Sequence, residues 1–168
     1  GQYALASMVI CLPSTLLGNA VGSVFYQRAA ERWAKGLAFT DIWSSTAKML
    51  LFLGVPLFSA AVLALPWLLP LVFGGRWRPA GAYGAILAIS SFFGFISNPM
   101  EKACLVVRAW WYVPLWHAAR VAATAMTVGL ALLCRWGMGT FIAVLVFQQA
   151  LLYLVDYFAE WRFSRRSP

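Results

Sequence analysis

The sequence predicts an all-α integral membrane protein with about five transmembrane helices. Hydrophobic residues make up 62% of its 168 positions and charged residues only 11%, whereas about a quarter of a soluble domain is charged. Four stretches contain no Asp, Glu, Lys, Arg or His, and they are 1–27, 49–75, 79–100 and 136–155. Each has roughly the 20 residues that a helix needs to cross a bilayer, and none shows the alternating pattern of a barrel strand.

The helices are expected at about 2–25, 46–69, 81–107, 112–133 and 140–161. The first contains Gly18 and Gly22, and two small residues at this spacing let another helix approach closely. The basic connection 27–45 that follows it is long enough for a short helix in the membrane interface, although its apolar face is narrow.

The third helix carries a polar face near its end. The residues of this face are Ser90, Gly94, Ser97 and Glu101, with Asn98 and Pro99 beside them. Proline removes a backbone hydrogen bond, so "SNPMEK" predicts a kink there. A kink beside Asn98 and Glu101 suits a gate or a coupling-ion site; the alternative is a surface ion pair between Glu101 and Arg108 or Lys102.

The fourth helix contains "WHAARVAATAMT", an apolar segment with a cation near its centre. At helical spacing four of its residues share one face, and they are His117, Arg120, Thr124 and Thr127. Lipid penalises such a stripe, so it is expected to face the protein interior or a hydrated cavity. The alternative is that Arg120 snorkels to the nearby interface.

The fifth helix carries two acidic residues close to the basic end of the chain, "RFSRRSP". These residues are Asp156 and Glu160. We expect them to be solvated or paired with the arginines of that end.

The positive charges are distributed unevenly between the two sides of the predicted bundle. One side carries nine Lys and Arg residues: Arg28, Arg32, Lys35, Lys48, Lys102, Arg108, Arg162, Arg165 and Arg166. The other side carries three: Arg76, Arg78 and Arg135. Because short cytoplasmic loops are enriched in Lys and Arg, the first residue is expected outside and the last in the cytoplasm.

Other classes of function find little support in the sequence. The net charge of +8 comes from short connections and not from a basic stripe, so no nucleic-acid partner is expected. One histidine, three scattered cysteines and no phosphate-binding glycine loop leave no pattern for an enzyme, a metal site or a cofactor.

Two stretches resemble a transporter family. One is "GQYALASMVICLPSTLLGNAVGSVFYQRAAE", with its "G-x-Y" start and mid-helix proline. The other is "PLVFGGRWRPAGAYGAILA", in which Phe73, Gly74, Trp77 and Ala80 match an "FG-x-x-W-x-x-A" external loop. Both are similar to the bacterial O-antigen, capsule and exopolysaccharide flippases of the multidrug/oligosaccharidyl-lipid/polysaccharide exporter superfamily.

This resemblance implies a two-lobe exporter of which residues 1–168 are part of the carboxy-terminal lobe, the amino-terminal lobe being absent. It implies an undecaprenyl-pyrophosphate-linked oligosaccharide as the substrate and the bacterial inner membrane as the location. Arg120, with His117, Thr124, Thr127 and Asn98, would then line the substrate path.

Two alternatives remain open at this point. A cation-coupled multidrug exporter of the same superfamily would need an acidic residue in its cavity, and none is expected in the middle of a helix. A non-transporting membrane subunit or anchor would be held to its partner through Gly18 and Gly22.

Overall fold

The computed structural model describes residues 2–167, except for the side chains of residues 2–6, 12 and 13. The elements are α1 (Gln2–Ala34), α2 (Thr40–Phe73), the 3-10 turn η1 (Gly75–Trp77), α3 (Arg78–Met100), α4 (Lys102–Val106), α5 (Tyr112–Leu133) and α6 (Met138–Ser164). Five helical stretches are long and apolar enough to cross a membrane. The predicted class, an all-α membrane protein, is confirmed.

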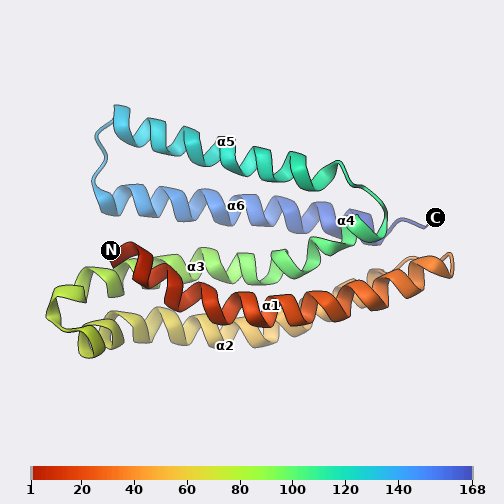
Figure 1. Cartoon of the computed structure of the whole chain (residues 1–168), viewed down its shortest axis with the longest axis horizontal. Coiled ribbons are helices and arrows are strands. Elements are labelled where there is room, and N and C mark those ends of the chain that lie inside the picture. The colour runs from red at the N-terminus through yellow and green to blue at the C-terminus, as the bar shows by residue number, and fades with distance from the viewer. Residues whose placement is uncertain (1, 168) are drawn as a thin grey trace.

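The long helices run alternately in opposite directions, so the two ends of the chain lie at opposite ends of the bundle (Figure 1). Helix α3 is the central one and packs against α1, α2 and α6, whereas α5 lies at the edge and packs mainly on α6. Half of the apolar window of α3 is buried inside the protein, against 11% for α5 and for α6. Most of the apolar window of α5 and of α6 therefore lies outside the core of the bundle.

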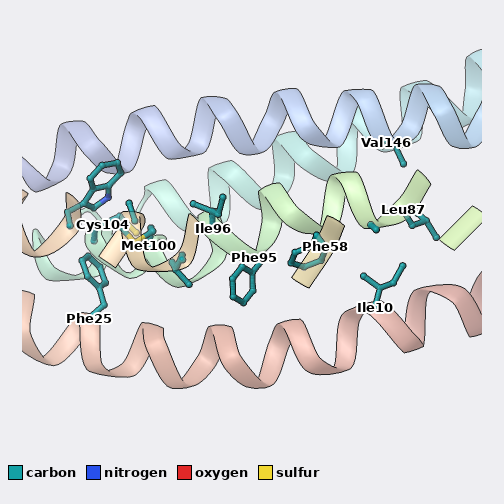
Figure 2. Packing of buried hydrophobic residues seen from close by; sticks show 14 of the residues in the cluster. Ile10, Phe25, Phe58, Leu87, Phe95, Ile96, Met100, Cys104 and Val146 are labelled. Atoms are coloured by element: carbon teal, nitrogen blue, oxygen red, sulfur yellow. The ribbon is translucent and has the colours of Figure 1, made fainter. Parts of the chain in front are cut away.

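Small residues allow α3 to occupy this central position. Gly81 lies against the backbone of α2, where an added Cβ would meet Leu65 O and Pro66 Cα at 2.8 Å. Gly94 lies close to the Tyr153 ring of α6, where an added Cβ would meet Tyr153 Cζ at 3.0 Å. Bulky side chains fill the spaces between these close approaches, and Figure 2 shows this core running along α3 between α1 and α6.

The first connection differs from the prediction. Helix α1 continues to Ala34 and α2 begins at Thr40, so most of residues 27–45 forms two helical ends and not a separate loop or interfacial helix. The tip is closed by Gly36, whose φ of 75° is in the left-handed region that glycine favours. Phe39 packs against Phe25 and Trp33 of α1, with ring centroids 6.3 and 6.4 Å apart. These contacts hold α1 and α2 together beyond the predicted ends of both helices.

The third predicted helix is interrupted where the proline suggested a kink. Helix α3 ends at Met100, one residue after Pro99, and the short α4 follows from Lys102. The interruption places α4 against α1 and α6 at one end of the bundle.

Candidate functional site

A groove with a mainly apolar lining and a set of polar groups follows the face formed by α1, α3, α5 and α6. It consists of three adjoining hollows of about 140, 330 and 790 Å³. The first and second share Cys11, Ser91 and Tyr153, and the second and third share Arg120, Thr124 and Gln149. The three hollows therefore adjoin one another between α4 and the middle of α5, with Tyr153, Arg120 and Gln149 at their borders.

The walls of this groove carry hydroxyl, amide and cationic groups. Helices α1 and α3 contribute Ser14, Thr15, Asn19, Ser90, Ser91 and Asn98, and α5 and α6 contribute His117, Arg120, Thr124, Gln149 and Tyr153. Lys102 of α4 closes one end. Among the residues that the structure describes, no aspartate or glutamate lines any of the three hollows. The groove therefore offers positive charge to an anion, and donors and acceptors to a polyhydroxylated molecule.

Arg120 is the central cation of the groove. Its Nη2 donates to the Tyr153 hydroxyl at 2.7 Å and lies 3.5 Å from Gln149 Oε1. Gln149 Nε2 in turn donates to Thr124 Oγ1 at 3.2 Å. No described carboxylate lies within hydrogen-bonding distance of the guanidinium. Neutral partners thus orient Arg120 and leave its charge available.

The four residues of the predicted polar face of α5 have different surroundings in the structure. Arg120 and Thr124 face the groove together with Gln149. Thr127 is buried and donates to Gln148 Oε1 of α6, outside the groove lining. His117 lies at the edge of the groove, half-exposed, with its Nε2 3.4 Å from Glu101 Oε1.

The two candidate residues at the end of α3, Asn98 and Glu101, also lie in different surroundings. Asn98 lines the groove beside Lys102. Glu101 lies outside the groove lining and faces His117 of α5, not Arg108 or Lys102 as the alternative supposed. Lys102 Nζ instead lies 3.4 Å from Ser23 Oγ of α1. The contact between Glu101 and His117 joins the junction of α3 and α4 to the first half of α5.

The expectation for the two acidic residues of α6 is wrong. Asp156 and Glu160 are 1% and 0% exposed, and within the described part of the chain neither pairs with an arginine. Asp156 accepts hydrogen bonds from Ser97 Oγ at 2.6 Å and from the Tyr112 hydroxyl at 2.7 Å. Glu160 Oε2 accepts from the backbone N–H of Cys104 at 3.2 Å, and its Oε1 has no hydrogen-bond partner among residues 2–167. These carboxyls join α6 to α3, α4 and the start of α5.

The small-residue pair on α1 is used within the chain. An added Cβ at Gly18 would lie 3.5 Å from Pro99 Cγ, and one at Gly22 would lie 3.2 Å from Pro99 Cα. The pair therefore receives α3 of the same chain, and a partner helix has no room on that surface.

Several groove residues were missing from the predicted set. The most important are Gln149 and Tyr153, which are four residues apart on α6 and match the spacing of Arg120 and Thr124 on α5. The available signal was the pair Gln148 and Gln149 in a stretch otherwise free of strongly polar side chains. Only the packing of α6 on α5 shows which amide reaches the groove.

Comparisons of the chain with models of protein families, with curated proteins and with solved structures found no match.

Proposed function

We propose that the chain is the carboxy-terminal part of a flippase that moves a lipid-linked oligosaccharide across the bacterial inner membrane for surface polysaccharide assembly. The observation that carries this proposal is Arg120, a cation inside a spanning helix whose described hydrogen-bond partners are neutral. A charged side chain within the bilayer costs roughly 2.5 kcal/mol or more. A protein can tolerate this cost where an anionic substrate or water interacts with the charge.

The chemistry of the groove fits the two polar parts of that substrate. A planar guanidinium can form two parallel hydrogen bonds to the oxygens of a pyrophosphate. Arg120 lines the broadest of the three hollows, next to α5 and α6. The hydroxyls and amides toward Lys102 suit sugar hydroxyls. Alternating access requires a second half opposite the groove, and in this proposal the amino-terminal lobe supplies it.

A cation-coupled multidrug exporter is the second candidate, and the acidic residues of α6 favour it. The sequence placed no carboxylate inside the bundle, whereas Asp156 and Glu160 are both buried there. They lie outside the groove lining, however, and the groove itself is cationic. A site that attracts cationic drugs would need a negative charge.

The membrane-anchor alternative loses its proposed contact surface, because α3 of the same chain already packs on Gly18 and Gly22.

Complementation tests the proposal. A flippase-null bacterium that expresses the chain within a complete two-lobe transporter is expected to regain surface polysaccharide, whereas residues 1–168 alone are expected to fail because the opposing wall of the path is missing. The measurement is surface polysaccharide at matched membrane abundance. Restoration by residues 1–168 alone would contradict the two-lobe proposal, and drug resistance without polysaccharide export would favour the second candidate.

The orientation is a separate prediction. Figure 1 shows the connections that carry Lys35 and Arg108 at the same end of the bundle as the C-terminus. With nine cations at that end and three at the other, we propose that it faces the cytoplasm. Single cysteines introduced beside Arg78 and Arg135 are expected to react with an impermeant reagent in spheroplasts, while cysteines at Lys35 and Ser167 are shielded. Labelling of position 167 from outside would reverse the orientation.

A further inference from the structure

A second groove opens between α1 and α2, and it shares no residue with the groove around Arg120. Its volume is about 380 Å³. Apolar side chains form its wall toward the middle of the two helices, and they include Val21, Val24 and Met49. Polar side chains line it toward the connection of the two helices, and they are Arg28, Ser45 and Thr46. The groove therefore changes from apolar to cationic along its length.

This change coincides with the edge of the apolar spans. Arg28 is the first charged residue of the chain, after the uncharged stretch 1–27. On the facing helix, Lys48 is the last charged residue before the uncharged stretch 49–75. The apolar wall thus lies at the depth of the hydrocarbon, and Arg28 lies at the depth where lipid headgroups begin.

Arg28 is free to meet an external anion. Its side chain is exposed and has no hydrogen bond or ion pair with any described residue. Its neighbour Arg32, one turn further along α1, differs because it pairs with Asp41 of α2. That ion pair and the contact between Phe25 and Phe39 hold the two walls together, so the groove exists before a ligand enters.

We infer that this groove binds an anionic phospholipid of the surrounding bilayer. An acyl chain would lie along Val21, Val24 and Met49, and the phosphate would meet the Arg28 guanidinium with the Ser45 hydroxyl as a second donor. A soluble phosphate would leave the apolar wall unused, and a zwitterionic lipid would gain less from the positive charge at this end of the bundle. The inference does not depend on what the transporter carries.

The test measures retention of phosphatidylglycerol by the purified full transporter, with native mass spectrometry after transfer from bilayers of phosphatidylglycerol and phosphatidylcholine. The protein is expected to retain phosphatidylglycerol in preference to phosphatidylcholine. Arg28→Gln is expected to weaken retention about fivefold, the effect of one cation near a headgroup. Lys35→Gln removes an exposed cation at the tip of the same hairpin, outside the groove, and is expected to leave retention unchanged.

Two further measurements distinguish a lipid bound in this groove from a folding defect and from a bound soluble phosphate. Arg28→Lys keeps the charge and is expected to retain the lipid within about twofold, which guards against a folding defect in the glutamine variant. Glycerol 3-phosphate, a headgroup without acyl chains, is expected not to compete. Equal losses in Arg28→Gln and Lys35→Gln would indicate a diffuse surface attraction and overturn the site. Competition by glycerol 3-phosphate, or equal retention of phosphatidylcholine, would overturn it as well.

Discussion

Replacement of Arg120 by alanine in the intact transporter is expected to reduce polysaccharide export to below about a tenth of the wild-type level, because a hydrogen bond to a charged group is worth about 1.5–3 kcal/mol. The membrane abundance of the protein is expected to stay normal, since the lost partners Tyr153 and Gln149 are neutral and half-exposed. Arg120→Lys keeps the charge without the planar fork and should retain partial export. Arg120→Glu should be at least as damaging as alanine because it would repel the pyrophosphate.

The matched control is Lys35→Ala, which removes an exposed cation far from the groove and should export normally. The readout is surface polysaccharide at equal expression. Full export by Arg120→Ala would reject a role in the path and favour a snorkelling arginine. A parallel fall in abundance would instead assign Arg120 to the packing of α5 on α6.

Gly81→Val is expected to lower the free energy of unfolding of the bundle by about 3 kcal/mol. The first carbon added at this position would lie 2.8 Å from both Leu65 O and Pro66 Cα. These are backbone atoms of α2, so no side-chain rotation relieves the overlap. The free energy of unfolding, measured in detergent with a denaturant series, should fall accordingly, and α2 should separate from α3.

Gly129→Val is the control because it makes the same change in a helix where, apart from the chain neighbours and the backbone of α5 itself, no described atom lies within 4 Å of the new Cβ. Its effect on the free energy of unfolding should stay within about 1 kcal/mol, the difference in helix propensity. If both variants lost the same stability, the close approach of α2 and α3 at Gly81 would be refuted.

The sequence was sufficient for the class of fold and for the number of apolar helices. Lipid requires each spanning segment to satisfy its own backbone hydrogen bonds, so length and hydropathy decide the matter locally. The ends of the helices were less predictable. Residues 26–34 are charged enough to resemble a connection, yet they are good helix formers, and contacts with Phe39 extend α1 to Ala34.

Residues of the groove could be predicted only where their spacing along a single helix indicated a shared face. Arg120 and Thr124 could be found from spacing on α5, but Gln149 and Tyr153 depend on how α6 packs against it. The failure at Asp156 has the same cause. Its hydrogen-bond donors, Ser97 and Tyr112, are 59 and 44 residues away in the chain, so polarity alone suggested exposure.

The native thiol of Cys11 offers the most direct measurement of whether the groove is a hydrated substrate path. Cys11 is exposed and lines two of the three hollows. With Cys104→Ala and Cys134→Ala in the intact transporter, it would be the single thiol of this lobe. A charged, water-soluble maleimide is expected to label Cys11, and the lipid-linked oligosaccharide is expected to slow that labelling, whereas an uncharged polyprenol does not. A thiol at Phe147→Cys in a Cys11→Ser background, at an exposed position of α6 that lines none of the three hollows, should stay unlabelled. Labelling of Cys11 that is no faster than at position 147, or that the lipid-linked oligosaccharide leaves unchanged, would contradict the proposed path.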